Sequence, residues 1–451
     1  MPAAEITLKT LKKLVERSPA DQTEALLLTE DSSLTRFTPV SVHQNVAERN
    51  QTLILRAALG KQVVGVTTNV LHRASLGNTL EKAISLARSL PPNPDFLSFP
   101  RPKPISEVRT YFEDIRSLTA GRKVEIVRQA MALAGEKGAR VSGAFSHGVV
   151  KVAVVNSLGV EARQKYSDLF FHVIAQNDQG SGYAGFVSRD PSQLQIEALT
   201  QAAVSKISGT TPIEVPPGEY EVILEPEAVN ELLAFMGYLG LHALAVQEGR
   251  SFLCNQFGKQ LVNEKVTIYD DGLDPEGLQV PFDFEGVPKQ KVIFFDHGVA
   301  RDITYDSLTA GRENKNSTGH ALMPPNTEGP IPVNLFLKKG DSSVEEMVRG
   351  VRKGIYITRF HYTNVAEPMK AVITGMTRDG TFLIEEGEIK NPIKNLRFTE
   401  SILKALSRVK AISRERKICS SGSVYGRRFV TGTVAPAVQI DGFNFSGVSA
   451  L

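Results

Sequence analysis

The longest apolar stretch of the chain runs from Pro226 to Gly249. Its large apolar side chains cover more than one side of a helical pattern, and they include Val229, Leu232, Leu233, Phe235, Met236, Leu239, Leu241 and Leu244. A helix that is apolar all round belongs in a core or against a partner. Because proline suits the first helical turn and glycine the C-terminal end, the pattern predicts one long buried helix. The stretch is not expected to span a membrane, because polar residues interrupt it at Glu227, Asn230, Glu231, His242 and Gln247.

The N-terminal half alternates between short apolar runs and helical patterns. Helices are predicted at 5–17, 78–90, 122–135 and 190–206. Short strands are predicted at 24–31, 34–42, 53–59, 62–70, 140–148, 150–157, 160–166 and 169–176, with a hairpin turn at 59–61 and a flexible turn at 180–186. The proline-rich stretch 91–104 reads as an extended connection. These elements predict a mixed domain with an antiparallel sheet.

A second proline-rich stretch, at 210–220, marks the predicted boundary between domains at 1–212 and 213–451. After the long helix, short strands and glycine turns dominate, with hairpins predicted at Asp379-Gly380 and Glu386-Gly387. Further helices are predicted at 344–353 and 398–412. The expected fold class is α+β: an N-terminal mixed domain followed by a β-rich C-terminal domain with one long buried helix.

Several motifs resemble the TldD/PmbA family of metallopeptidases. They are GRSFLCNQFGKQL at 249–261, VPFDFEGVPKQKVIFFDHGV at 280–299, NSTGHAL at 316–322, RFHYTNV at 359–365, TGMTRDGTFLIEEGEI at 374–389 and PAVQIDGFNFSGV at 436–448, with LILRAALGKQVVGVTTNVL at 53–71 similar to the family's N-terminal hairpin. The resemblance covers most of the C-terminal half. It implies a protein that dimerises, with C-terminal domains enclosing a cavity that unfolded peptide can enter.

The zinc motif of the catalytic relatives is missing from this chain. A zinc peptidase of this type needs two histidines about one helical turn apart and a carboxylate to activate water. The His-Glu-x-x-x-His pattern should fall between Ala234 and Leu239, where the residues are Ala, Phe, Met, Gly, Tyr and Leu. No metal is therefore assigned here. The chain resembles the PmbA (TldE) branch, which also lacks the motif, more than the catalytic TldD branch.

Four residues remain candidates for binding peptide or for a relocated site. His320 lies in STGHAL, His361 and Tyr362 lie in RFHY, and Cys419 looks like the position where catalytic relatives supply a zinc thiolate. Two alternatives stay open: these residues contact a substrate or a subunit without metal, or His320, His361 and Cys419 gather zinc away from the usual helix. The other histidines have no ligand-spaced neighbours.

Composition excludes several other classes of protein. The net charge of +3 is too small for a nucleic-acid-binding surface, and the basic run 408–417 is predicted at a helix end, where cations suit the macrodipole. Two cysteines without a CxxC pair, and an N-terminus without an apolar signal core, predict a cytoplasmic protein. The leading hypothesis is a PmbA/TldE-like non-catalytic subunit, as a homodimer or beside a TldD-like catalytic subunit. The alternatives are an autonomous metallopeptidase and a peptide-binding scaffold.

Overall fold

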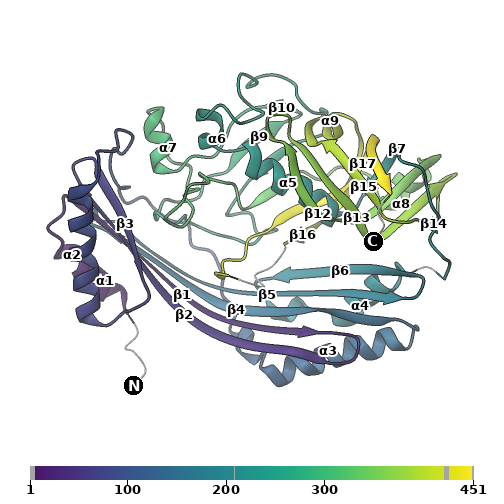
Figure 1. Cartoon of the computed structure of the whole chain (residues 1–451), viewed down its shortest axis with the longest axis horizontal. Coiled ribbons are helices and arrows are strands. Elements are labelled where there is room, and N and C mark those ends of the chain that lie inside the picture. The colour runs from purple at the N-terminus through teal and green to yellow at the C-terminus, as the bar shows by residue number, and fades with distance from the viewer. Residues whose placement is uncertain (1–5, 208, 421–425, 449–451) are drawn as a thin grey trace.

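A computed structural model describes residues 6–207, 209–420 and 426–448, which form two sheets with helices around them (Figure 1). The first sheet uses residues 22–188 and the second uses residues 218–448. The α+β fold expected from the sequence is confirmed. Within the described residues, no helix is both long enough and apolar enough to cross a membrane.

The first sheet is a six-stranded antiparallel sheet in the order β3-β2-β1-β4-β5-β6. Its strands are β1 (Gln22–Phe37), β2 (Val42–Leu59), β3 (Gln62–Thr68), β4 (Arg140–Asn156), β5 (Glu161–Asn177) and β6 (Gly180–Ser188). The predicted hairpin at 59–61 is present, with Gly60 at φ +55°. The predicted strands at 53–59 and 62–70 correspond to the second half of β2 and to β3. The other predicted strands are too short: 24–31 and the start of 34–42 merge into β1 of 16 residues, and the pairs at 140–157 and 160–176 merge into β4 and β5 of 17 residues each.

Helices cover the outer face of this sheet. They are α1 (Leu8–Glu16), α2 (Arg73–Ser89), α3 (Ala120–Gly135) and α4 (Ile196–Val204), with short 3₁₀ turns η1 (Glu113–Ser117) and η2 (Pro191–Gln193). Figure 1 shows α1 and α2 at one end of the sheet and α3 at the other. Leu11 of α1 and Leu80 of α2 pack on Leu27 and Leu55, whereas Val127 of α3 packs in a separate cluster with Phe145.

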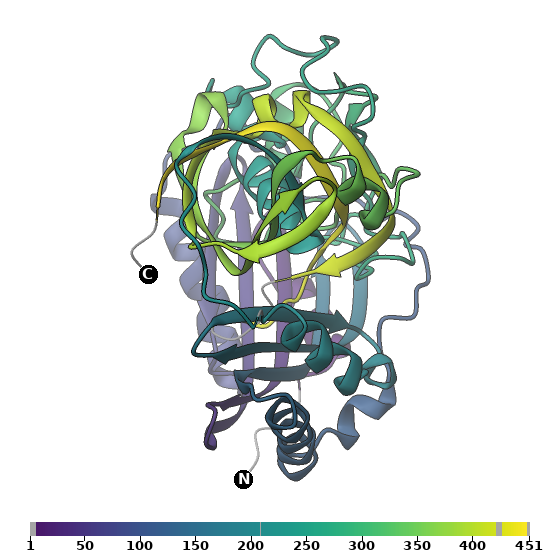
Figure 2. The same cartoon turned by 90° about the vertical axis from the view of Figure 1, so that its right-hand side faces the viewer.

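The second sheet closes on itself through five strands, β7-β12-β13-β15-β17, because β17 also pairs with β7 (Figure 2). Their bounds are β7 (Gly218–Leu224), β12 (Lys353–Glu367), β13 (Val372–Glu385), β15 (Leu396–Ser401) and β17 (Thr433–Val448). The remaining strands extend this ring: β8 (Ile268–Asp270), β9 (Val292–Asp296), β10 (Val299–Ala300), β11 (Leu335–Leu337), β14 (Glu388–Pro392) and β16 (Val409–Cys419). The helices of this half are α5 (Pro226–Gly240), α6 (Ala243–Gln247), α7 (Ser307–Arg312), α8 (Val344–Arg349) and α9 (Ile402–Ser407), with η3 (Pro368–Lys370).

The single long helix predicted between Pro226 and Gly249 is wrong, because the chain breaks it into α5 and α6. Gly240 lies where an added Cβ would come within 2.7 Å of Ser251 Oγ and of the Phe252 ring, so the backbone there packs directly on the following loop. Backbone groups freed by the break find partners in Thr304, whose carbonyl accepts from Ala243 at 2.9 Å and whose N–H donates to the Leu241 carbonyl at 3.1 Å. Tertiary hydrogen bonds thus replace the helical ones.

Three other predictions are corrected. Residues 180–186 form part of strand β6, because Gly182 leaves space for the Ala203 carbonyl, 2.1 Å from where a Cβ would lie. Asp379 and Gly380 form a β-bulge within β13, at φ +52° and +119°, whereas the hairpin at Glu386-Gly387 is present. Of the basic run 408–417, Arg408 is the C-cap of the short helix α9, whereas residues 409–417 lie in β16, so the macrodipole argument does not apply to those residues.

The inner face of the first sheet packs against the C-terminal half. Leu26, Ile54 and Val150 share one apolar cluster with Phe282 and Phe284 from the loop after β8. A crevice between β6 with α4 and α5 with β16 lies at one border of this contact.

Candidate functional site

One stripe of helix α5 carries polar or exposed residues, although the rest of the helix is core. Leu232, Leu233 and Met236 are among the buried residues of the helix. The stripe consists of Glu227, Glu231, Ala234 and Tyr238, whose spacings of four, three and four residues place them on one face. Ala234 and Tyr238 are exposed. The helix therefore presents two carboxylates and an exposed aromatic ring away from its own core.

The end of strand β16 brings Lys417 and Cys419 to the first of these carboxylates. Lys417 Nζ lies 2.8 Å from Glu227 Oε1, and Cys419 is buried beside them. Burial raises the pKa of the Cys419 thiol well above its usual value, and the negative charge of Glu227 raises it further. Burial acts to lower the pKa of Lys417, but Glu227 outweighs it and the pKa is raised. Cys419 is thus held as a thiol next to a lysine–glutamate pair, and the thiolate needed for nucleophilic attack or zinc ligation is disfavoured.

The N-terminal sheet completes the cluster through strand β6. Ser181 Oγ donates to Asp379 Oδ1 at 2.7 Å, and Arg359 Nε donates to Asp379 Oδ2 at 2.9 Å. The Arg359 guanidinium also lies 4.5 Å from the centre of the Tyr183 ring. Asp379 can bridge the two sheets because it sits in the β13 bulge, where one extra residue redirects the side chain.

A crevice of about 370 Å³ opens between these elements. Two lysine–glutamate pairs line it: Lys417 with Glu227, and Lys206 Nζ with Glu225 Oε2 at 2.7 Å. Gly185 of β6 allows the close approach, because a Cβ there would lie 2.6 Å from the Tyr183 hydroxyl and 3.2 Å from Glu227 Oε1. The crevice therefore combines paired charges with the Tyr183 ring.

His361 and Tyr362 lie further along β12, on the strand that supplies Arg359. Burial lowers the pKa of His361, and the positive charge of Arg359 lowers it further. Tyr362 is 68% exposed and has a left-handed φ of +50°, and its ring centre is 4.3 Å from that of His361. From Arg359 to Glu367, β12 pairs with β13 alone among the described strands, so its other edge has no strand partner there.

His320 belongs to a different cluster from His361, Tyr362 and Cys419. Its Nε2 lies 2.9 Å from Asp270 Oδ1, while Asp270 Oδ2 accepts the N–H of Asn334 at 2.7 Å and Lys289 Nζ lies 3.6 Å from Oδ1. Burial lowers the pKa of His320. Burial would raise the pKa of Asp270, but the charges of Lys289 and His320 hold it below its usual range. His320 thus anchors a buried carboxylate and shares no hydrogen bond or ion pair with His361 or Cys419.

The described residues do not supply a zinc site. Nowhere in 6–207, 209–420 or 426–448 do three His, Cys, Asp or Glu side chains converge so that they could hold a metal ion. In the stretch where the zinc motif of catalytic relatives would fall, the exposed positions are Ala234 and Tyr238, and Leu239 is buried in the core. Beside Cys419, the cation paired with Glu227 is the Lys417 ammonium. No metal-dependent step follows from this arrangement.

Two family profiles match most of the chain. Residues 217–447 match the PmbA/TldA metallopeptidase C-terminal domain, and residues 113–208 match the central domain of the same family. The chain belongs to the PmbA/TldD family. Among its curated relatives is a Metalloprotease TldD homolog of Buchnera aphidicola subsp. Acyrthosiphon pisum, 25% identical over 260 residues that cover 56% of this chain and 52% of the relative. A Metalloprotease of Methanothermobacter thermautotrophicus is 23% identical over 59% of this chain and 60% of its own length. The chain thus aligns with about half the length of these PmbA/TldD relatives.

A solved PmbA/TldD structure shares the whole fold. The crystal structure of TldE from Thermococcus kodakarensis matches with a TM-score of 0.87 and 18% identity, covering 97% of this chain and 99% of the other. At this identity the match establishes the fold alone.

Sequence reasoning did not select Glu227, Lys417, Tyr183 or the Arg359–Asp379 pair. One available signal was the pair Glu227 and Glu231, two carboxylates one turn apart on an otherwise apolar helix. The remaining contacts join residues up to 198 positions apart, and no local pattern indicates them.

Proposed function

We propose that this chain is a PmbA/TldE-like non-catalytic subunit of a TldD-type metallopeptidase. In this role it binds unfolded peptide and forms part of the wall of an enclosed dimer chamber, while a partner cleaves the peptide. The observation that carries the proposal is the α5 face. Where a catalytic relative needs two histidines and a glutamate, this chain has Ala234, Leu239 and Phe235, and Cys419 lies beside a lysine.

The peptide would pair with the open edge of β12. Main-chain hydrogen bonds to a strand edge accept many sequences, which suits an unfolded substrate. Tyr362 offers an exposed ring next to that edge, and His361 lies half-buried beside it. The crevice lined by Glu227 and Lys417 would receive polar side chains of the same peptide.

The partner in this proposal is a TldD-like catalytic subunit, and a homodimer is the second arrangement. Several relatives of this chain are named TldD homologs, and its fold matches a solved TldE. We further propose a cytoplasmic location, in keeping with the unpaired Cys254 and Cys419, and a division into domains 1–212 and 213–451.

The proposal is tested by metal analysis and peptide hydrolysis on the same preparation. Protein is purified without chelator or tag histidines, beside the variant His361→Ala/Cys419→Ala. The expected result is metal at background level and no hydrolysis of labelled unfolded casein. Hydrolysis should then appear when a TldD-type chain with an intact His-Glu-x-x-x-His motif, from the same organism, is added. About one zinc per chain, lost in the double variant, would overturn the non-catalytic role.

Peptide binding is measured separately by fluorescence anisotropy of the labelled casein. Tyr362→Ala should weaken binding several-fold, whereas Phe257→Ala, another exposed aromatic truncation, should leave it unchanged. Equal binding by the two variants would exclude the β12 edge. Peptide binding without any gain in hydrolysis from the TldD-type chain would favour a scaffold over a peptidase subunit.

A further inference from the structure

The open edge of β12 that we propose for peptide begins at the β13 bulge. Before this point β12 pairs with β7 on one side and with β13 on the other, and the last pair with β7 joins Ile357 to Leu224. At the next step, Thr358 of β12 faces two residues of β13, Asp379 and Gly380. A bulge bends its strand and increases the local twist, so this one sets the direction in which the open edge leaves the ring.

The residues of this bulge pack tightly. Asp379 has a φ of +52° and Gly380 a φ of +119°. A Cβ on Gly380 would lie 2.5 Å from Thr358 Oγ1, so glycine is needed for the two strands to approach this closely. Asp379 is only 4% exposed, and a left-handed φ at a residue with a side chain persists where the surrounding structure holds it. The carboxylate of Asp379 is therefore held in a defined place.

This one buried carboxylate joins the open edge to the N-terminal sheet. Asp379 Oδ2 accepts a hydrogen bond from Arg359 Nε at 2.9 Å, and Arg359 is the first residue of the open edge. Asp379 Oδ1 accepts from Ser181 Oγ of β6 at 2.7 Å. Hydrogen bonds to a charged group are stronger than those between neutral groups. The start of the edge and strand β6 thus share one strong acceptor.

Tyr183 adds a second contact from the same face of β6. Ser181 and Tyr183 are two residues apart on the strand, which places both side chains on one face. The Arg359 guanidinium lies 4.5 Å from the centre of the Tyr183 ring, close enough for a cation–π attraction. The position of Arg359 therefore depends on the N-terminal sheet as well as on β13.

We propose that Asp379 is a positioning residue for peptide binding. By holding Arg359 against Ser181 it fixes the start of the open edge, and peptide pairing there depends on the contact between the N-terminal sheet and the C-terminal half. A preformed edge lowers the ordering cost of binding, so a residue that acts through Arg359 affects affinity. The inference rests on the peptide-binding role of β12 proposed above.

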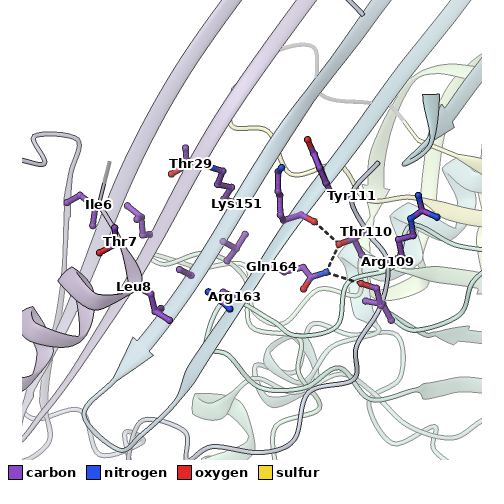
Figure 3. Close-up of a pocket in the computed structure, with 15 residues that line it drawn as sticks. Ile6, Thr7, Leu8, Thr29, Arg109, Thr110, Tyr111, Lys151, Arg163 and Gln164 are labelled. Atoms are coloured by element: carbon purple, nitrogen blue, oxygen red, sulfur yellow. Dashed lines mark hydrogen bonds between the residues drawn. The ribbon is translucent and has the colours of Figure 1, made fainter. Parts of the chain in front are cut away.

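Two variants weaken this link to different extents. Asp379→Asn removes the charge and keeps the size of the side chain, and asparagine also tolerates a left-handed φ. Ser181→Ala removes only the hydroxyl contact with β6 and gives a second readout if Asp379→Asn fails to fold. The control is Gln164→Ala, near the other end of β5 from Gln176, which pairs with Ser181. Gln164 Nε2 donates to the Val108 carbonyl at 3.2 Å, as Figure 3 shows, so the control also breaks a hydrogen bond within the N-terminal half.

Casein anisotropy and hydrolysis with the added TldD-type chain are measured for each variant. Asp379→Asn should weaken casein binding about fivefold and raise KM by a similar factor with kcat unchanged. Ser181→Ala should weaken binding about twofold, and Gln164→Ala should bind as the natural chain does. Urea unfolding shows how much stability each variant loses. A lower stability alone reduces the amount of folded chain, which lowers the apparent kcat and leaves KM unchanged.

The outcomes separate this inference from the proposed function. If Asp379→Asn and Ser181→Ala bind casein as the natural chain does while Tyr362→Ala binds more weakly, the positioning role is overturned and the peptide-binding edge stands. A lower kcat with unchanged KM in Asp379→Asn would also overturn the positioning role. No casein binding by the natural chain would overturn both proposals.

Discussion

Gly148 of β4 has no room for a side chain. A Cβ there would lie 2.3 Å from the Asp31 carbonyl oxygen and 2.5 Å from Arg428 Nε, in the middle of a buried ion-pair cluster. Gly148→Ala should therefore lower the free energy of unfolding by roughly 2 to 3 kcal/mol, because a strand or Arg428 must move. Gly180→Ala is the matched control, since nothing lies within 4 Å of its added Cβ. Urea unfolding measures both, and equal values would contradict the packing argument.

Glu24 and Glu285 share one cation, Arg56. Arg56 Nε lies 2.8 Å from Glu24 Oε1, and its Nη2 lies 3.0 Å from Glu285 Oε1. Burial raises the pKa of Glu24 to about 7 from 4.5, and Glu285 adds to this while Arg56 opposes it. Between pH 4.5 and about pH 7, the Glu24 carboxyl group therefore stays protonated in the folded chain but is ionised in the unfolded chain. The free energy of unfolding should fall as pH rises through this window, by an amount on the order of 3 kcal/mol.

Glu24→Gln tests this sign, because glutamine resembles the protonated carboxyl group. Urea unfolding between pH 4.5 and pH 7 should show a shallower decline for this variant than for the natural chain. Glu81→Gln, at an exposed position on α2, should keep the natural slope. A slope unchanged by Glu24→Gln would show that Glu24 does not carry the proton.

At the scale of elements, the break between α5 and α6 depends on Gly240. An alanine there would place its Cβ 2.7 Å from Ser251 Oγ and from the buried Phe252 ring. We expect Gly240→Ala to cost about 1 to 3 kcal/mol of unfolding free energy, although alanine favours a helix more than glycine does. Gly77→Ala, inside α2 with nothing within 4 Å, should instead gain about 0.5 to 1 kcal/mol. Thermal unfolding of the two variants should shift in opposite directions, and a gain at Gly240 would refute the packing explanation.

The elements that sequence predicted well are those with local signals. Pro226 begins α5, and the Leu59–Gln62 hairpin turns at Gly60 as expected. The predicted strands at 24–31 and 34–42 leave the polar residues Ser32 and Ser33 between them. In the structure this polar segment continues the strand, since β2 and β4 pair with it on both sides and Lys123 Nζ donates to Ser33 Oγ at 2.6 Å. Partners that are distant in sequence determine whether a polar segment of this kind continues a strand, and the spacing of residues along the chain does not indicate those partners.

The same limit applies to the candidate site. Family motifs indicated His361, Tyr362 and Cys419, but they also indicated His320, which the structure places on Asp270. The contact between Lys417 and Glu227 joins residues 190 positions apart. Its existence depends on where β16 ends relative to α5, which only the assembled fold determines.

At the scale of the whole molecule, Arg428 ties the C-terminal half to the N-terminal sheet. Its guanidinium is buried against Asp168 of β5, with Nε 3.1 Å from Oδ2, and Nη1 lies 2.9 Å from Ser146 Oγ. Its main-chain N–H donates to the Glu30 carboxylate. Removing one charge of such a buried pair leaves the opposite charge buried without a partner, which typically lowers the free energy of unfolding by about 3 to 5 kcal/mol.

Arg428→Met should therefore destabilise the chain by about 3 to 5 kcal/mol and loosen the contact between the two halves. Arg414→Met is the control, because the Arg414–Glu346 pair has a similar contact of 2.8 Å but is about half exposed, and exposed pairs contribute about 1 kcal/mol or less. The double variant Arg428→Met/Asp168→Asn should recover part of the loss, since it removes the stranded carboxylate. Urea unfolding gives the free energies, and limited proteolysis reports whether the halves separate before either unfolds. If Arg428→Met costs no more than Arg414→Met, then the apolar cluster around Phe282 and Phe284, and not this ion pair, holds the two halves together.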